Sequence, residues 1–333
     1  MSTLTQDYLS VDSLNQLPEL LKQPGVLALV GFVEDCSEPG SPGYIPVGMP
    51  SLSGKPLEVI RYGHQPAERG VTDACHWSLI DDVLCAACWI SPKDCEDIAT
   101  ATEKTYGRLF RLIQSMGFPY PFRIWNFIPN INQGDGDGEE YKKFCVGRHK
   151  AFHSWHVAPH EYPAASALGH HGQGAVIYLL AGRYSGVHHE NPRQQPAYQY
   201  PRQYGPSSPS FARATCLNLN SQSQVFISGT ASIIGHDTHA AGNLRNQLSI
   251  TLDNIQQLVA HIDQSHHSLS AIRVYLRHPH DYPDAQAFMS DAHASMANRQ
   301  QFSLDRVNFL HADICRDPLL VEIEALASPL RNP

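Results

Sequence analysis

The chain has 333 residues, a formal net charge of −8 and a composition of 42% hydrophobic and 17% charged residues. This composition is that of a globular protein, and the length allows two domains or one large one. Because the balance is acidic and no run of Lys or Arg occurs, nucleic acids and anionic membrane surfaces are not expected as partners. The apolar run from Gly25 to Phe32 is far too short to cross a bilayer.

The sequence starts without the basic and apolar regions of a secretory signal. The eight cysteines are therefore expected to be reduced thiols, and the protein is expected to be cytoplasmic. Cys85 and Cys88 have the spacing of a metal or redox motif, but they lie in Val83–Ile90, which has the pattern of a buried strand. Alternation would point the two thiols to opposite faces. The histidines show no ligand spacing either, so no metal is expected.

The predicted elements follow in chain order. Residues 1–60 are expected to be rich in loops, with one strand near Val26–Phe32. After the strand at residues 83–90, apolar residues at helical spacing and an acidic first turn predict a helix from about Lys93 to Met116. Gly117 is a plausible helix stop, and the next strand is expected at residues 123–128.

The same order of elements returns roughly 150 residues later. A strand is predicted at residues 224–234, a helix at 243–261 and a strand at 271–276. Two strand–helix–strand units predict a duplicated α+β fold in which long helices pack on a mixed sheet. The similar strand starts at Arg123 and Arg273 favour a common origin, although any α/β protein can show this order by chance.

The segment of residues 182–213 between the units is irregular and rich in Tyr, Pro, Gln and Arg. A flexible linker would contain more Gly and Ser and less Tyr. Aromatic and Arg side chains on a proline-stiffened segment are typical of recognition. We predict a binding loop, with a plain surface loop as the alternative.

Near the C-terminus, residues 319–324 predict a strand that starts fully buried and then alternates. Pro318 fits the turn before this strand, which places the Cys315 thiol and the Arg316 guanidinium at one end of it and Glu322 further along. A carboxylate on an inner strand is costly unless it is paired or used. These residues therefore predict a pocket for an anionic substrate; the alternative is an edge strand with solvated Glu322 and Glu324.

Five motifs in these segments resemble the chorismatases, whose C-terminal half belongs to the RidA-like (YjgF/UK114) fold. The resemblance covers most of the chain. It implies a degenerate RidA-like domain over residues 1–150 and a catalytic RidA-like domain over residues 151–333. The motifs are Arg123-Ile-Trp-Asn-Phe-Ile-Pro-Asn-Ile131, Glu140-Tyr-Lys-Lys-Phe-Cys-Val-Gly-Arg148, Tyr200-Pro-Arg-Gln-Tyr-Gly-Pro-Ser-Ser-Pro-Ser-Phe-Ala-Arg213, Phe226-Ile-Ser-Gly-Thr-Ala-Ser-Ile-Ile-Gly-His236 and Ala312-Asp-Ile-Cys-Arg-Asp-Pro-Leu-Leu-Val-Glu-Ile-Glu324.

The resemblance implies removal of the enolpyruvyl group of chorismate as pyruvate, without a cofactor. Cleavage of a vinyl ether begins with protonation of its methylene carbon, which requires a carboxylic acid that keeps its proton near pH 7. Glu322 matches the catalytic acid of the family, and burial would raise its pKa in the required direction. Glu324, on the same strand face, is expected to be solvated or to support Glu322 from behind.

Chorismate carries two carboxylates, and the resemblance places Arg148 and Arg213 as planar clamps for them. Tyr204 and the backbone at Gly229 and Thr230 are expected to add hydrogen bonds to the substrate. The alternative for Arg148 is a structural salt bridge, since Arg is also the usual choice for buried ion pairs.

Members of the family differ in the ring product. Some release a dihydroxycyclohexadiene carboxylate, whereas others aromatise the ring to 3-hydroxybenzoate, in some members together with 4-hydroxybenzoate. The resemblance associates a Gly and a Cys in the pocket with aromatisation, and this chain has Gly229 and Cys315. Cys315 is expected to act as a polar partner or nucleophile to the ring. Alternatively it only fills space.

Two other functions stay open at this point. An imine or enamine deaminase of the RidA type uses a similar fold, although such proteins are about half this length and lack the Tyr/Pro/Arg loop. A non-catalytic binder of small aromatic acids is the second alternative. RidA-like proteins are commonly trimers, so the chain is expected to form either a homotrimer or a monomer whose repeats supply part of that arrangement.

Overall fold

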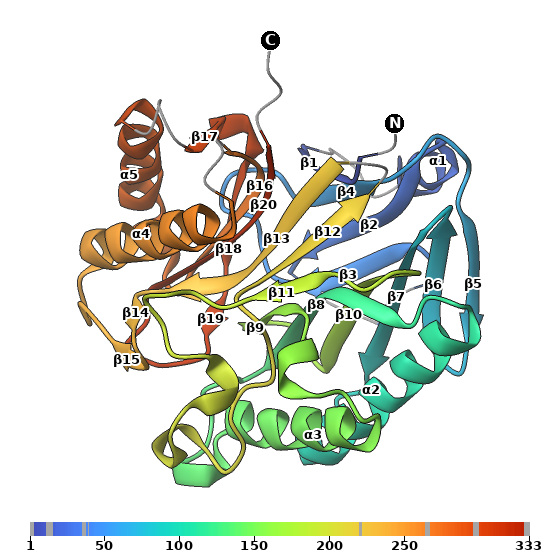
Figure 1. Cartoon of the computed structure of the whole chain (residues 1–333), viewed down its shortest axis with the longest axis horizontal. Helices are drawn as coiled ribbons and strands as arrows, with labels where there is room; N and C mark the ends of the chain where they lie inside the picture. Colours follow the sequence, from blue (N-terminus) through green and yellow to red (C-terminus); the bar gives the residue numbers. More distant parts are fainter. Residues whose placement is uncertain are drawn as a thin grey trace.

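The computed structural model describes residues 3–10, 16–34, 38, 40–219, 222–263, 267–295 and 300–329. Three sheets face one another in the centre of the molecule, and the long helices lie on the outside (Figure 1). The predicted α+β class is therefore confirmed.

The first sheet has four strands in the order β1-β4-β2-β3. The prediction that residues 1–60 are loop-rich with one strand is wrong. Three of these strands have only five residues, and β3 contains Pro46 and ends at Gly48, so their sequence pattern is too short to stand out. The elements are β1 Thr5–Leu9, α1 Leu17–Lys22, β2 Val26–Val33, β3 Tyr44–Gly48 and β4 Leu57–Arg61.

The middle sheet has seven strands in the order β19-β9-β8-β10-β7-β6-β5, and α2 and α3 cover its outer face. The predicted strands at residues 83–90 and 123–128 are β7 and β8, which confirms both. The elements are β5 Glu68–Thr72, β6 Cys75–Ile80, β7 Val83–Ile90, α2 Ile98–Ser115, β8 Tyr120–Pro129, α3 Glu140–Ser154, β9 Ala164–His170, β10 Ala175–Gly182 and β19 Asp313–Ile314.

The C-terminal sheet has the order β11-β12-β13-β20-β16-β17, with β18 also paired to β16. Helices α4 and α5 cover its outer face. The elements are β11 Val187–His189, β12 Ala214–Leu219, β13 Gln222–Ala231, α4 Leu244–Ile262, β16 His267–Leu276, α5 Tyr282–Ser295, β17 Gln300–Phe302, β18 Val307–His311 and β20 Val321–Pro329, with the small hairpin β14 Ile233–Ile234 and β15 Asp237–Thr238.

The predicted duplication is visible in the order of the strands. The middle sheet runs β5-β6-β7-β10-β8-β9 and the C-terminal sheet runs β11-β12-β13-β20-β16-β18. In each sheet, the last strand of the repeat lies antiparallel between two earlier strands that are joined in the chain by a long helix. β10 lies between β7 and β8, and β20 lies between β13 and β16. Residue 150, the predicted domain boundary, falls inside α3, because β9 and β10 complete the middle sheet. The division into a degenerate and a catalytic domain stays a prediction.

Both predicted long helices have side-chain caps. Asp97 accepts a hydrogen bond from the Thr100 amide at the start of α2, and Asn243 accepts one from the Asn246 amide at the start of α4. Helix α2 begins at Ile98 rather than Lys93, because residues 94–97 form a separate 3₁₀ turn.

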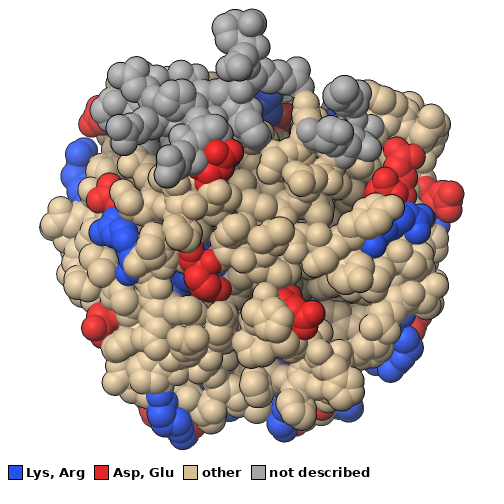
Figure 2. Space-filling model, in the orientation of Figure 1, with Lys and Arg blue, Asp and Glu red and all other residues tan. Residues whose placement is uncertain are grey.

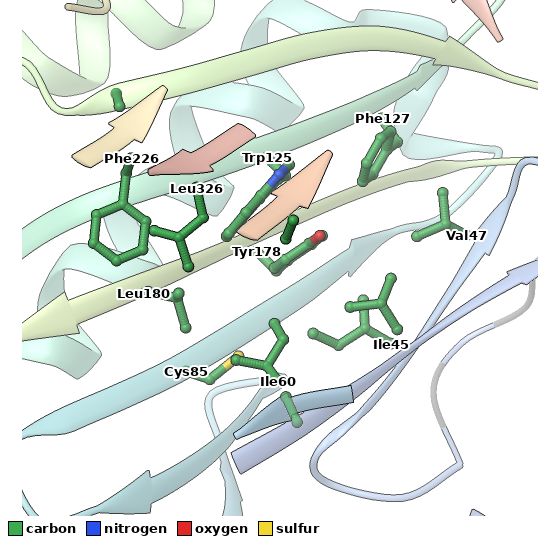
Figure 3. Close-up of a cluster of buried hydrophobic side chains, with 14 of the residues drawn as sticks. Ile45, Val47, Ile60, Cys85, Trp125, Phe127, Tyr178, Leu180, Phe226 and Leu326 are labelled. Carbon is green, nitrogen blue, oxygen red and sulfur yellow. The ribbon is translucent and has the colours of Figure 1, made fainter. Parts of the chain in front are cut away.

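The inner faces of the three sheets form one shared core. Trp125 of β8 stacks on Tyr178 of β10, with ring centroids 4.6 Å apart. Because one apolar cluster joins all three sheets, it fixes how the middle and C-terminal sheets sit relative to each other. Figure 3 shows members from each sheet: Ile45, Val47 and Ile60; Cys85, Phe127 and Leu180; Phe226 and Leu326.

The cysteines depart from one expectation. Cys85 faces the central core and Cys88 faces α2, which confirms that they point to opposite faces. Cys88 forms a disulfide with Cys75, directly opposite on β6 with a Cα–Cα distance of 4.7 Å, so the prediction that all thiols are reduced is wrong. The cytoplasmic location, which rested on reduced thiols, stays a prediction.

The surface charges are mixed in sign. On the face seen in Figure 2, Lys and Arg side chains alternate with Asp and Glu, and large areas carry neither. Across the described ranges, we find no helix with both the length and the apolar character that a bilayer span requires.

Candidate active site

A cavity of about 310 Å³ lies between the middle and C-terminal sheets. Helix α3 and strand β9 form one side, β13 and β20 form the other, and residues 200–213 cover it. Six of the seven site residues predicted from the sequence line this cavity: Arg148, Tyr204, Arg213, Gly229, Cys315 and Glu322.

Glu322 lies on β20, which pairs with β13 on one side and β16 on the other. The alternative of a solvated edge strand is therefore wrong, and the side chain is only 4% exposed. Burial raises the pKa of Glu322 to about 8, with a further contribution from neighbouring Glu324 and against the opposing effect of Arg123 and Arg213. The carboxyl group therefore holds its proton at neutral pH.

Glu324, two residues along the same strand, has the opposite environment. It accepts hydrogen bonds from Arg123 Nη2 at 2.6 Å, Ser166 Oγ at 2.5 Å and Trp125 Nε1 at 2.7 Å, and Arg273 Nη1 lies 3.1 Å away. Burial acts to raise the pKa of Glu324, but these guanidinium groups and hydrogen bonds outweigh it and lower the pKa below its usual value. Glu324 is thus a paired carboxylate that supports the site, rather than a solvated one.

Arg148 reaches the cavity from α3 and is 1% exposed. Its guanidinium stands 4.9 Å from the ring centroid of Phe144, and its Nε and Nη2 atoms have no hydrogen-bond partner in the described part of the chain. Among the described residues, no carboxylate lies within ion-pair distance of it, so the salt-bridge alternative is wrong. A buried cation with unpaired donors and no carboxylate beside it is costly, which makes Arg148 a strong candidate to bind an anion.

Arg213 precedes β12 and approaches the cavity from the other side. Its Nη2 atom donates to the Tyr200 hydroxyl at 2.7 Å and to the Gln195 carbonyl at 3.2 Å. Its buried Nε has no partner among the described residues. The guanidinium is thus held in place by the loop while part of its donor capacity stays free.

The Tyr/Pro/Arg segment supplies several cavity residues, as expected for a binding loop. Tyr204 ends a 3₁₀ turn, and the Arg316 guanidinium stacks over its ring at 4.0 Å. Arg316 also donates to the His236 carbonyl at 2.8 Å, so the turn before β20 contacts both this segment and the β14–β15 hairpin. Arg202 holds the outer end through a two-point ion pair with Asp137, at 2.8 and 2.6 Å.

Gly229 lies against the acid. A bulge interrupts the pairing of β13 with β20 around this residue, and the freed Gly229 amide donates to Ser166 Oγ at 2.9 Å. A methyl group on Gly229 would come within 1.9 Å of Glu322 Oε1, so a side chain there would displace the carboxyl group.

Thr230 is the predicted site residue that lies outside the cavity. Its hydroxyl donates to the Ser228 carbonyl at 2.9 Å, and the residue is fully buried. Since neighbouring strand residues point to opposite faces, the Thr230 side chain points away from the cavity that Gly229 lines. A hydrogen bond from the backbone here to the substrate stays a prediction.

Cys315, in the turn between β19 and β20, lines the cavity beside Glu322. Burial and the nearby acid raise the pKa of its thiol to about 12. The thiol is therefore protonated at neutral pH, which favours a polar or space-filling role over that of a thiolate nucleophile.

The site residues predicted from the sequence did not include Ser166, and no role at the site was predicted for Arg123 or Arg273. Ser166 Oγ accepts from Arg123 Nη2 at 2.7 Å and from Gly229, and it donates to Glu324, so it links the acid strand to its neighbours. The similar strand starts at Arg123 and Arg273 were the sequence signal that could have revealed these roles. The two residues occupy equivalent positions in the two repeats, and both guanidiniums pair with Glu324.

Comparison with known proteins agrees with this geometry. Residues 59–181 match a family model described as "Chorismatase FkbO/Hyg5-like, N-terminal". The chain is 35% identical to a 3-hydroxybenzoate synthase of Streptomyces hygroscopicus over 90% of this chain and 91% of that protein, and 34% identical to a chorismatase of the same organism over 80% and 78%. A chorismatase crystal structure matches with a TM-score of 0.80 at 29% identity and covers 98% of both chains. The similarity spans nearly the whole length, so this chain belongs to the chorismatase family.

Proposed function

We propose that this enzyme removes the enolpyruvyl group of chorismate as pyruvate and aromatises the ring to 3-hydroxybenzoate, the product in the name of its 35% identical relative. One observation carries the proposal: a buried, protonated carboxylic acid shares one cavity with two buried guanidiniums that have unpaired N–H groups. That arrangement suits a dianionic substrate that must be protonated on carbon.

The residues divide the reaction between them. Arg148 and Arg213 hold the two carboxylates, which places the methylene carbon of the enolpyruvyl group next to Glu322. Glu322 transfers its proton to that carbon, and the carboxylate that remains stabilises the oxocarbenium-like centre beside it. Cleavage of the bond between the ring carbon and the ether oxygen then releases pyruvate, which keeps that oxygen as its carbonyl.

The ring product depends on what attacks the ring carbon or the cation. If the neighbouring ring hydroxyl attacks the ring carbon that carried the ether oxygen, an epoxide-like intermediate forms. Opening of this epoxide and loss of a proton from the ring then give 3-hydroxybenzoate. If water adds to the cation instead, the products are the dihydroxycyclohexadiene carboxylate and pyruvate. Gly229 and the neutral thiol of Cys315 beside Glu322 support the first route.

Both repeats of one chain supply cavity residues. We infer that the duplicated chain provides for itself the contact that separate subunits make in RidA-like trimers. Light scattering of the purified protein tests this: a monomer with full activity agrees with the inference, whereas activity that is lost on dilution of a trimer opposes it.

The decisive experiment compares the wild-type chain with Glu322→Gln. Incubation of the wild type with chorismate should yield equal amounts of pyruvate and hydroxybenzoate, measured by an enzyme-coupled pyruvate assay and by chromatography with mass detection. Glu322→Gln should bind chorismate within a few-fold of wild type and turn over about two to four orders of magnitude more slowly. Near-normal turnover in the folded variant would move the acid elsewhere, and a wild type that releases no pyruvate would refute the function.

A further inference from the structure

Behind the acid lies a buried chain of four charged side chains, and none of them lines the cavity. Arg123 Nη2 stands 2.6 Å from Glu324, Glu324 stands 3.1 Å from Arg273 Nη1, and Arg273 Nε stands 2.7 Å from Glu58. Every ion pair in this cluster joins neighbours of opposite sign along the chain of four. Two positive and two negative groups sum to zero.

Glu322 is adjacent to this cluster but takes no part in its ion pairs. Within the described ranges, no Lys or Arg nitrogen lies within ion-pair distance of its carboxyl group. The cations closest in effect are Arg123, which Glu324 already engages, and Arg213 across the cavity. These two cations favour the ionised form of Glu322 only in part, and burial outweighs them.

The charge balance of this cluster depends on the N-terminal sheet. Glu58 comes from β4 in the N-terminal sheet, whereas the acid is on β20. Gln6 of β1 donates from Nε2 to Glu58 Oε1 at 2.9 Å and orients it toward Arg273. The N-terminal sheet, which supplies none of the cavity residues, thus supplies the fourth charge of the cluster.

We propose that Glu58 is a positioning residue for the reaction: by holding Arg273 it keeps the buried cluster neutral, so that Glu322 remains the protonated acid. The inference rests on the proposed role of Glu322. Without the charge of Glu58 the cluster would carry one uncompensated positive charge. That charge cannot be lost by titration, since Arg does not deprotonate in proteins, and it would favour the carboxylate form of Glu322.

The other titratable groups that face the cluster are neutral near pH 8. Tyr8 of β1, Tyr178 of β10 and Tyr275 of β16 all have pKa values raised by burial, and Tyr178 and Tyr275 accept hydrogen bonds from Arg273. On the cavity side the thiol of Cys315 is also neutral, because burial raises its pKa to about 12. None of these groups can replace the charge of Glu58 in that pH range.

The test is the pH dependence of kcat/KM for chorismate in the full chain. Wild-type activity should fall as pH rises through about 8, because Glu322 loses its proton there. In Glu58→Gln this fall should begin about one pH unit lower, at the low end of the pKa shift that an added opposite charge causes in a carboxyl group. In the double variant Glu58→Gln/Arg273→Gln the cluster is neutral again, so the pH at which kcat/KM falls should return toward the wild-type value. Glu19→Gln, on exposed α1, is the matched control and should not move it.

A second pair of variants leaves Glu58 in place, in case its removal prevents folding. Gln6→Lys puts a positive charge against Glu58 and should shift the fall in the same direction, whereas the neutral Gln6→Met should not. A purely structural role for Glu58 predicts lower stability with an unchanged pH profile, and that result in both series would overturn the inference.

A direct titration separates this inference from the proposed function. In protein labelled with ¹³C at Glu carboxyl groups, the Glu322 resonance is assigned by its loss in Glu322→Gln. Its titration midpoint should be lower in Glu58→Gln and in Gln6→Lys than in wild type. An unchanged midpoint would refute the inference even if chorismate is turned over, and a shifted midpoint without turnover would leave the inference standing while the function fails.

Discussion

Glu322 and Glu324 have the same side chain on the same strand face, yet they are in opposite protonation states. The difference comes from their neighbours: two guanidiniums, a Trp N–H and a Ser hydroxyl surround Glu324, whereas burial without an ion-pair partner raises the pKa of Glu322. Two carboxyl groups with divergent pKa values are the pattern expected of an acid and its electrostatic support.

The binding role proposed for Arg148 can be tested because of its environment. Because two of its buried donors have no protein partner, Arg148→Met should leave the free energy of unfolding equal or higher. It should also weaken kcat/KM for chorismate by about 30-fold or more, the cost of leaving a bound carboxylate without its partner. Thermal unfolding and steady-state kinetics measure the two effects. Lys150→Met, exposed on the same helix, is the control. A destabilised variant with normal kinetics would assign Arg148 a structural role.

Product choice is best tested at Cys315 alone. Gly229→Ala would push on the Glu322 carboxyl group, so its effect on the product cannot be separated from an effect on the acid. Cys315→Ala should still release pyruvate, and its ring product should shift toward the diol. A difference of about 1.4 kcal/mol between the two transition states is enough for a tenfold change in ratio. Chromatography with mass detection measures the ratio; hydroxybenzoate as the undiminished product would mean that the thiol does not control the outcome.

At the scale of elements, the repeat explains how the acid strand is supported. β10 and β20 enter their sheets in equivalent positions, and Arg123 and Arg273 lie at matching points of β8 and β16. Arg273 is paired with Glu324 in the register, whereas Arg123 is paired with Leu180. The guanidinium that finds no acid in its own sheet reaches across to Glu324. Duplication thus gives one carboxylate two cations.

The covering loop allows a second prediction at this scale. Arg202 and Asp137 form an exposed ion pair that joins this loop to the turn before α3. Exposed pairs contribute little to stability, so Asp137→Asn should leave the unfolding temperature unchanged within error. If the pair holds the loop over the cavity, KM for chorismate should rise about two- to fivefold at unchanged kcat, and the effect should fade in high salt. Asp135→Asn in the same turn is the control; equal kinetics in both variants would show that the pair does not position the loop.

At the scale of the whole molecule, the acid imposes a cost on stability. The pKa of Glu322 is about 8 in the folded protein against 4.5 as its ordinary value. Between these values the unfolded chain releases a proton that the folded chain keeps, so stability should fall as pH rises through this window. Glu322→Gln removes this dependence and should be more stable than wild type by a few kcal/mol near pH 8.5, and by little at pH 4.5.

Urea unfolding at several pH values measures that difference. The exposed variant Glu19→Gln should track the wild type throughout. A Glu322→Gln variant that is destabilised equally at both ends of the range would show that the buried carboxyl group is not the source of the pH dependence.

The elements with local signals could be predicted from the sequence. The apolar periodicity of α2 and α4, the buried strands β7, β8 and β20 and the Tyr/Pro/Arg loop were all predicted, because side-chain spacing is decided within a few residues. The resemblance of short motifs located six residues of the cavity. The short strands of the N-terminal sheet were missed, since five residues carry too little pattern.

The charge pairs around the cavity result from the packing of distant segments. Arg123 is 201 residues from Glu324, and Glu58 is 215 residues from Arg273, and no local pattern encodes such pairings. They determine that Glu324 is ionised and Glu322 is not, because a pKa depends on burial and on the charges around a group rather than on its place in the chain. The alternation of β13 likewise turned Thr230 away from the cavity while Gly229 faces it. The sequence therefore pointed to Glu322 as the candidate acid, and the packing of three sheets buries its carboxyl group and raises its pKa.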